Sequence, residues 1–239
     1  MSKFNEVVQM LDTKKVYSRN EMITLLQTSL PALNNGSYQW ALGSLLKSGQ
    51  VNRIGYNEYA LPGEKSLPTY SPAYSDLAEE VMKKAEARFP GIQFTVFETV
   101  LMNEFLNHLI AQNTVFLQAE KEIGVFIFRY FQEEANYHLL YKPTKKDFYL
   151  YWQRDCIVIT DLISEAPLSL TQPHRITIEK ILVDIWCDKL ISGTYSAGEY
   201  PDVLAQAFAK YQIDRPRLLR YARRRNKENE ILRILDNHS

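Results

Sequence analysis

The sequence has few residues that could cross-link the chain through disulfides or metal ions, or anchor it in a membrane. Only two of its 239 residues are cysteines, Cys156 and Cys187, and neither stands in a CxxC or Cys/His pattern. Neither a disulfide framework nor a zinc site is therefore expected, and both thiols are predicted to be buried and reduced. No apolar stretch is long enough to span a bilayer, and no signal segment opens the chain. We therefore expect a cytoplasmic protein without a membrane partner.

Motifs for nucleotide or metal chemistry are also missing. The sequence contains no Walker A loop, no GxGxxG, and no Gly-Ser turn followed by paired aspartates. Its four histidines, at positions 108, 138, 174 and 238, have no ligands at metal-binding spacing. We therefore expect no cofactor, no metal and no catalytic residue.

The formal net charge is zero, but the charge is unevenly distributed. Residues 1–65 carry seven basic and five acidic groups, and residues 215–239 carry eight basic and three acidic groups. The middle of the chain is therefore acidic. Such asymmetry indicates a charged partner at one end of the molecule.

Residues 1–65 predict three helices followed by a hairpin. Apolar residues recur at helical spacing in "KFNEVVQMLD". Ser18 followed by Glu21 is a capping-box pattern for a second helix. A third helix in "SYQWALGSLLKSG" ends at Gly49, and "QVNRIGYNEYAL" reads as strand, turn, strand. This order is typical of a winged helix-turn-helix domain.

The rest of the chain predicts a linker and an α/β (α+β) domain. Residues 66–75 are rich in proline and serine and read as the linker. In residues 76–239, "IQFTVF", "TVFLQAE", "YHLLYKP", "FYLYW" and "CIVITDL" are predicted strands. "TVLMNEFLNHL" is a predicted helix, and "EIGVFIFRYFQEE" fits a helix or a strand. Interleaved strands and helices favour a mixed sheet, here followed by a helical tail.

The third helix of the N-terminal domain has the pattern of a DNA-recognition helix. Stepped at 100° per residue, its apolar residues gather on one side, as in a core-facing helix. Polar residues and Trp40 occupy the other side, which could enter a major groove. Gln39 can pair with an adenine edge, whereas Lys47 and Arg53 suit phosphates. The residues predicted to contact DNA are Asn35, Ser37, Gln39, Trp40, Ser44, Lys47, Arg53, Tyr56 and Asn57.

The stretch "SYQWALGSLLKSGQVNRIGYNEYAL" resembles the N-terminal winged helix of the AbiEi-like antitoxins of type IV toxin–antitoxin (abortive infection) systems. The matching residues are Trp40, Leu45, Gly49, Arg53, Gly55 and Tyr59. The chain departs from that pattern at Ala41, where a basic residue is usual. It departs again at Gly55-Tyr56-Asn57, where Gly-Arg-Gly is usual. Both departures remove positive charge from the expected DNA side.

The resemblance extends through "FETVLMNEFLNH", "FLQAEKEIGVFIFR", "LISEAPL", "IEKILVDIWCDKL" and "LLRYARRRNKENEI". It implies a phage-defence protein that represses its own operon through the winged helix. Its operator is expected to be an inverted repeat. The functional partner implied for the C-terminal domain is a nucleotidyltransferase-like toxin encoded beside it.

Two other functions fit parts of the sequence. A nuclease could combine the carboxylates of Glu98, Glu120 and Glu122 with Lys121 in a site that holds Mg²⁺ and polarises a water. However, Glu120 and Lys121 are adjacent, so on a strand their side chains point to opposite faces. The third possibility is an adaptor whose winged helix binds protein.

Two charged helices near the C-terminus have simpler interpretations. Lys180, Asp184 and Asp188 follow at spacings of four, which predicts charge pairs along one amphipathic helix and no metal site. In "RPRLLRYARRR", Arg217, Arg220 and Arg224 form one predicted solvated stripe, a secondary contact for a polyanion. Arg223 and Arg225 are expected to flank this stripe and cover apolar surface, and Asn226 to cap the helix that follows.

Overall fold

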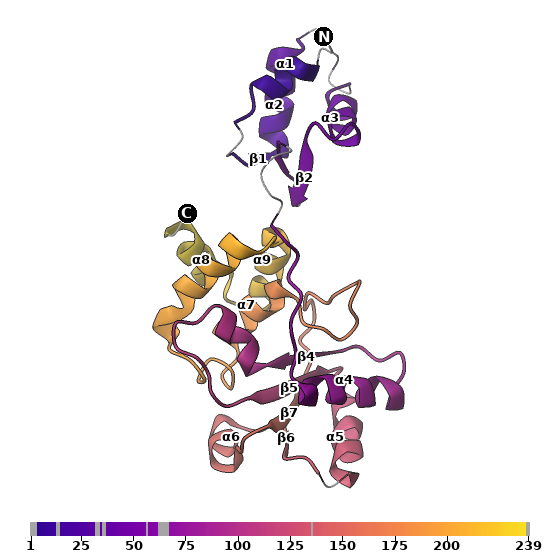
Figure 1. The fold of residues 1–239 in the computed structure, drawn as a ribbon, viewed down its shortest axis with the longest axis vertical. Coiled ribbons are helices and arrows are strands. Elements are labelled where there is room, and N and C mark those ends of the chain that lie inside the picture. The colour runs from indigo at the N-terminus through magenta and orange to yellow at the C-terminus, as the bar shows by residue number, and fades with distance from the viewer. Residues whose placement is uncertain are drawn as a thin grey trace. The chain divides into compact units, whose positions relative to one another are not determined.

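The chain folds into two compact units, each with its own β-sheet. The computed structural model describes residues 4–12, 15–31, 34, 37–55, 57–61, 67–134 and 136–237 (Figure 1). The first unit is Met1–Thr69 with Gln212–Arg215, and the second is Tyr70–Tyr211 with Pro216–Ser239. The expected mixed α/β class is confirmed. No helix in the described ranges is both long and apolar enough to cross a membrane.

The first unit contains three helices and a three-stranded antiparallel sheet. The helices are α1 (Phe4–Gln9), α2 (Arg19–Ser29) and α3 (Ser37–Lys47). The strands are β1 (Tyr17–Ser18), β2 (Asn52–Gly55) and β3 (Glu58–Ala60), arranged in the order β1-β3-β2. The predicted hairpin is thus present, and β1 adds a third strand beside it.

The predicted capping box begins α2. The Glu21 N–H donates to the Ser18 hydroxyl at 3.2 Å, and the Ser18 N–H donates to the Glu21 carboxylate at 2.7 Å. Two helix-end donors are satisfied in this way. The apolar faces of the three helices meet in one core with residues of the small sheet. The buried residues of this core are Val7, Leu11, Tyr17, Met22, Leu26, Leu30, Tyr38, Ala41, Leu42, Leu45, Val51 and Tyr59.

The second unit is built on a four-stranded mixed sheet in the order β4-β5-β7-β6. The strands are β4 (Phe94–Glu98), β5 (Thr114–Ala119), β6 (Leu139–Tyr141) and β7 (Cys156–Asp161). β4 is antiparallel to β5, whereas β5, β7 and β6 are parallel. Parallel strands need crossover connections, and these are α5 (Gly124–Glu133) and α6 (Lys145–Tyr151).

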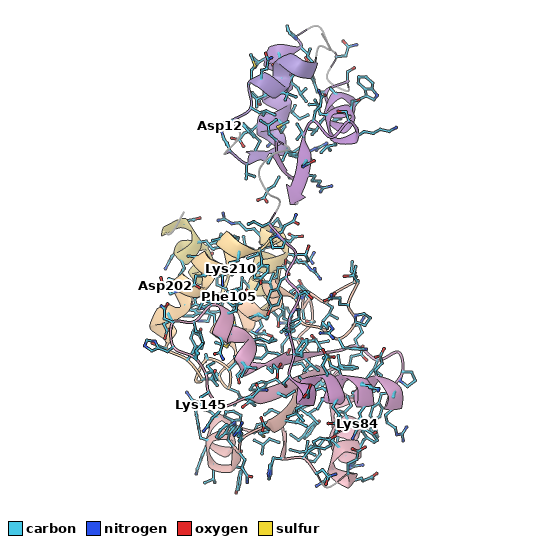
Figure 2. The ribbon with its side chains drawn as sticks, in the orientation of Figure 1. Asp12, Lys84, Phe105, Lys145, Asp202 and Lys210 are labelled. Atoms are coloured by element: carbon cyan, nitrogen blue, oxygen red, sulfur yellow. The ribbon has the colours of Figure 1, made fainter. Side chains whose placement is uncertain are left out.

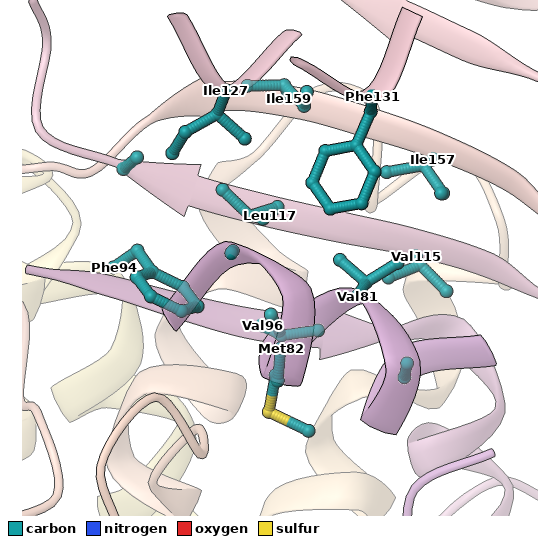
Figure 3. Packing of buried hydrophobic residues seen from close by; sticks show 13 residues of the cluster. Val81, Met82, Phe94, Val96, Val115, Leu117, Ile127, Phe131, Ile157 and Ile159 are labelled. Carbon is teal, nitrogen blue, oxygen red and sulfur yellow. The ribbon is translucent and has the colours of Figure 1, made fainter. Parts of the chain in front are cut away.

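Helices cover both faces of this sheet. On one face, α4 (Asp76–Arg88) and α5 bury apolar side chains against alternate residues of β4, β5 and β7 (Figure 3). On the other face lie α6 and α7 (Ile178–Cys187), since Phe116 contacts Phe148 and Gln118 contacts Asp184. The C-terminal helices are α8 (Tyr200–Lys210), α9 (Arg215–Arg224) and α10 (Glu228–Asn237), and short 3-10 helices span Thr99–Glu104 and Ala197–Glu199.

Three local predictions were wrong. "FYLYW" is not a strand, because Thr144 and Asp147 form a capping box that begins α6. Only Thr99–Glu104 of "TVLMNEFLNHL" is helical, as a 3-10 helix. Asn226 ends α9 instead of capping α10. It has φ 57°, its N–H bonds to the Arg223 carbonyl at 2.9 Å, and the next N–H bonds to the Ala222 carbonyl at 2.9 Å, as in a Schellman motif.

The largest difference from expectation concerns α7. The sequence predicts an amphipathic helix with charge pairs of the kind found on helix surfaces, but Glu179, Lys180 and Asp184 are all buried. The predicted pairing of Lys180 with Asp184 is present, and it is shielded from solvent. The polar side of α7 therefore faces other parts of the protein.

Candidate nucleic-acid interface

Helix α3 is fixed by one face and exposes the other. The Tyr38 hydroxyl donates to the Leu30 carbonyl at 3.2 Å, which ties α3 to the end of α2. The Ser37 N–H donates to the Asn34 carbonyl at 2.8 Å at the start of the helix. Tyr38, Ala41, Leu42 and Leu45 are buried as predicted, so the orientation of α3 within the unit is set by apolar packing.

The opposite face of α3 carries the predicted DNA-contacting side chains. Gln39, Trp40 and Lys47 are exposed, and the Trp40 side chain has 65% of its surface accessible. Ser37 and Ser44 are half-buried at the edges of this face. Gly43 is exposed, and a Cβ added there would meet nothing within 4 Å. This face therefore combines amide, indole and ammonium groups around a position without a side chain.

The hairpin places two more predicted residues in the same unit. Arg53 on β2 is exposed, and Asn57 at the turn is half-buried with φ 59°. The Asn57 carbonyl accepts the Arg19 N–H at 2.9 Å, so the turn is joined to the start of α2. The remaining predicted contacts, Asn35 and Tyr56, lie outside the described residues.

The predicted arginine stripe on α9 is only partly free in solvent. Arg220 is exposed. Arg224 is also exposed, but its Nε donates to the Ser164 hydroxyl at 2.6 Å. Arg217 is half-buried and donates to the Leu168 carbonyl. Two of the three arginines are therefore engaged by the segment that follows β7.

The two arginines expected to flank this stripe have specific partners. Arg223 makes two hydrogen bonds of 2.7 Å to the Glu228 carboxylate. Arg225 is mostly buried, and its Nη1 lies 3.3 Å from Oδ1 of Asp184. The three consecutive arginines therefore have three different partners: Arg223 pairs with Glu228 at the surface, Arg224 binds a serine, and Arg225 pairs with the buried Asp184.

Sequence reasoning missed the buried network that Arg225 completes. The Asp184 carboxylate accepts from Lys180 of the same helix, from the Tyr221 hydroxyl at 2.8 Å, and from Gln118 at 3.5 Å. Burial lowers the pKa of Lys180, and the Asp184 charge opposes this shift. One carboxylate thus serves two cations that come from α7 and from the end of α9.

The carboxylates of the nuclease hypothesis do not converge. Glu98 is fully buried and accepts three hydrogen bonds of 2.6 Å, two from Ser75 and one from Asn113. In the antiparallel register, Glu98 pairs with Val115 at one end of β5, whereas Glu120 follows the other end. At the usual rise per strand residue the two are separated by roughly 13 Å or more. Lys121 and Glu122 are exposed near Glu120.

The described residues contain no group of three histidine, cysteine, aspartate or glutamate side chains that could hold a metal ion. Both cysteines are free. Cys156 is buried and Cys187 is half-buried, and burial raises the pKa of each thiol to about 11. Such thiols are poor nucleophiles at neutral pH.

A polar cleft of about 520 Å³ lies beside α4. Its lining includes Glu80, Lys84, Tyr137 and Arg154, and Lys84 is labelled in Figure 2. The Lys84 ammonium is bound by both Glu80 and Glu134, and the Tyr137 hydroxyl donates to Glu80 at 2.5 Å. The Lys84 ammonium in this cleft is therefore already neutralised by carboxylates of its own unit.

Comparison with protein families gives a match over most of the chain. The profile of a family described as "Family of unknown function (DUF6577)" matches residues 37–239. The match begins at the first residue of α3 and includes the hairpin and the second unit. No curated protein matches the chain.

Proposed function

This chain belongs to the DUF6577 family of unknown function, and we propose that it is a non-catalytic, DNA-binding transcriptional autorepressor. We further propose that it serves as the antitoxin of a type IV toxin–antitoxin system of the abortive-infection kind. In this proposal the first unit is a winged helix-turn-helix domain that reads operator DNA in the cytoplasm.

The observation that carries the proposal is the division of α3 into two faces. One face is buried in the core of the first unit, and the other presents Gln39, Trp40, Gly43 and Lys47 to solvent. A helix fixed by its apolar side and polar on the other side can enter a major groove without unfolding its domain. The hairpin beside it offers Arg53 for a phosphate.

Each exposed side chain has a distinct role in this proposal. The Gln39 amide can donate to N7 of an adenine and accept from its N6 amino group. Lys47 and Arg53 neutralise phosphates and thereby fix the position of the helix without specifying sequence. Trp40 contacts a thymine methyl group or a sugar, and Gly43 allows the helix backbone to approach the duplex closely.

The antitoxin role of the second unit is supported by the resemblance to the AbiEi-like antitoxins. Its proposed functional partner is a nucleotidyltransferase-like toxin encoded beside it. Glu98 is buried and accepts three hydrogen bonds, which argues against a nuclease built on Glu98 and Glu120. The raised pKa values of Cys156 and Cys187 argue against a cysteine nucleophile.

A gel-shift titration on the DNA upstream of the protein's own gene tests the proposal. Binding should be sequence-selective and should weaken as salt is raised, because phosphate contacts release counterions. Gln39→Ala should reduce the preference for the operator over unrelated DNA, whereas Lys47→Ala should weaken binding to all sequences alike. An absence of selective binding by the folded wild-type chain would contradict the repressor role.

Two matched control variants test whether the effects on DNA binding are specific to α3. Gln27→Ala removes another exposed glutamine of the first unit, on α2, and Lys83→Ala removes an exposed lysine of α4. Neither should change the affinity for DNA. If Gln27→Ala reduces selectivity as much as Gln39→Ala does, α3 is not the reading element.

A further inference from the structure

The sheet of the second unit has two edges, and they differ. The outer edge of β4 is covered by the protein's own chain, since the Val96 N–H donates to the His174 carbonyl at 2.9 Å and Val96 bridges to Arg175. The opposite edge is β6, which pairs only with β7 among the described residues. An open edge presents unpaired backbone donors and acceptors to any strand that can pair with it.

The backbone pattern of β6 shows which groups are open. The Ile157 N–H donates to the His138 carbonyl at 2.8 Å, and the Lys142 N–H donates to the Ile159 carbonyl at 2.9 Å. Since alternate residues of a strand bond to the same neighbour, Leu140 also faces β7. The N–H and C=O groups of Leu139 and Tyr141 therefore point away from the sheet.

The side chains at this edge are apolar and half-exposed. Leu139 and Tyr141 pack partly against the core on the α4 and α5 face, and Leu140 points to the other face. On the Leu140 side of the sheet lies α6, whose Tyr149, Leu150 and Tyr151 are more than half exposed. Exposed apolar side chains near an open sheet edge are a feature of protein–protein contact sites.

The charges around β6 favour one particular occupant. The chain that enters β6 carries Glu133 and Glu134, and the chain that leaves it carries Lys142, Lys145 and Lys146. Glu134 and Lys142 already form ion pairs within the unit, with Lys84 and Asp161, so the charges open to a partner are the other three. Glu133, Lys145 and Lys146 are exposed, and Lys145 is labelled on α6 in Figure 2. In an antiparallel pair of identical strands, Glu133 of each copy lies at the same end of the paired strands as Lys145 and Lys146 of the other. The segment is thus complementary in charge to a second copy of itself.

We propose that the protein forms a two-fold symmetric dimer in which the β6 strands of two copies pair antiparallel. The axis passes between the two Leu140 residues, and Leu139 of each copy exchanges both backbone hydrogen bonds with Tyr141 of the other. The two sheets then become one continuous sheet. This inference uses the second unit alone and does not depend on DNA binding, although a dimer with two N-terminal units suits an inverted repeat.

The test measures the oligomeric state of the full chain by sedimentation equilibrium over a wide concentration range. The wild-type chain should dimerise. Leu139→Pro removes the outward N–H of this residue and leaves the bonds between β6 and β7 in place. It should weaken the dimer by roughly tenfold or more, since two hydrogen bonds are lost per dimer. Leu139→Ala keeps the N–H and should weaken it less.

Cross-linking gives a second readout that does not require a proline to be tolerated. The Cα atoms of the two Leu140 residues would be about 4.5 Å apart, within the range for a disulfide. Leu140→Cys treated with oxidised glutathione should therefore yield a covalent dimer. Leu139→Cys should not, because its symmetry mate is more than about 7 Å away. The wild type should not either.

Three results would overturn the inference. The first is a wild-type chain that stays monomeric at every concentration. The second is a dimer whose affinity is unchanged by Leu139→Pro in a folded variant. The third is a covalent dimer from Leu139→Cys with none from Leu140→Cys, which indicates another register. The double variant Lys145→Glu, Lys146→Glu should weaken the dimer, and an unchanged or tighter dimer would contradict the charge argument for a second copy.

Discussion

The Tyr221 hydroxyl on α9 donates a 2.8 Å hydrogen bond to Oδ1 of Asp184 on α7, and both side chains are buried. The same carboxylate is the counter-ion of Lys180 and Arg225. A buried ion pair of this kind costs desolvation energy when it forms, but removing one partner leaves the other charge buried without compensation. The attachment of α9 to α7 is therefore sensitive to the charge at position 184.

Asp184→Asn keeps the size of this side chain and removes its charge. The free energy of unfolding should fall by about 3 to 5 kcal/mol, because two buried cations lose their counter-ion. Urea titration of the full chain measures the change. Asp202→Asn, at an exposed aspartate in the first turn of α8, is the matched control and should cost less than about 1 kcal/mol. Equal losses in the two variants would contradict a special role for Asp184.

The same substitution should change how stability depends on pH. Burial lowers the pKa of Lys180 in the folded protein, and the charge of Asp184 opposes this shift. Without that charge the folded-state pKa falls further below the unfolded value, so the unfolded chain binds more protons between the two values. Stability then rises with pH in that window. The total rise should be larger for Asp184→Asn than for the wild type, because the window between the two pKa values is wider.

Glu98 offers a second test of a buried carboxylate. It accepts from the Ser75 N–H, the Ser75 hydroxyl and the Asn113 amide, each at 2.6 Å. Glu98→Gln places an NH₂ group against these donors, so at least one buried group loses its partner. We expect a loss of about 1 to 3 kcal/mol in unfolding free energy. The matched control is Glu120→Gln at an exposed position, which should be near neutral, and a neutral Glu98→Gln would contradict the assignment.

Local signals predicted the first unit well. The capping box of Ser18 and Glu21 begins α2, and the apolar stripe of α3 is the buried one. Both signals lie within a few residues of the element they specify, so spacing alone reveals them. The same spacing argument assigned the exposed face of α3, and its contact with DNA stays a prediction.

The buried network was not predictable in the same way. A lysine and an aspartate at i and i+4 give the same pattern on a solvated helix and on a buried one. The buried case differs in that Gln118, Tyr221 and Arg225 contact Asp184, and these residues come from distant parts of the chain. For α6 a local signal was available: Thr144 followed by Asp147 has the spacing of a capping box, but the run of aromatic residues favoured a strand.

The stability contribution of Glu21 should depend on pH. The Ser18 N–H, Lys15 and the Ser18 hydroxyl lower the pKa of Glu21 to about 2. A folded-state pKa below the unfolded value contributes stability that is present above the unfolded pKa, about 4.3, and is lost as pH falls towards 2. The stability difference between the wild type and Glu21→Gln should therefore be largest near neutral pH and shrink through this window. A difference that does not vary with pH would contradict the charged capping box.

Trp40→Ala should affect DNA binding more than the stability of the fold. Its side chain is 65% exposed on the face of α3 opposite the core, so Trp40→Ala should change the free energy of unfolding by no more than about 0.5 kcal/mol. If the indole contacts a thymine methyl group or a sugar, operator affinity should fall by roughly tenfold, or about 1.4 kcal/mol.

Fluorescence anisotropy with a labelled operator and urea titration of the same samples give the two numbers for Trp40→Ala. Phe126→Ala removes an exposed aromatic side chain of α5 and should leave operator affinity unchanged. A Trp40→Ala variant that binds DNA as the wild type does would remove the indole from the interface. A variant that unfolds easily would instead assign Trp40 to the stability of the first unit.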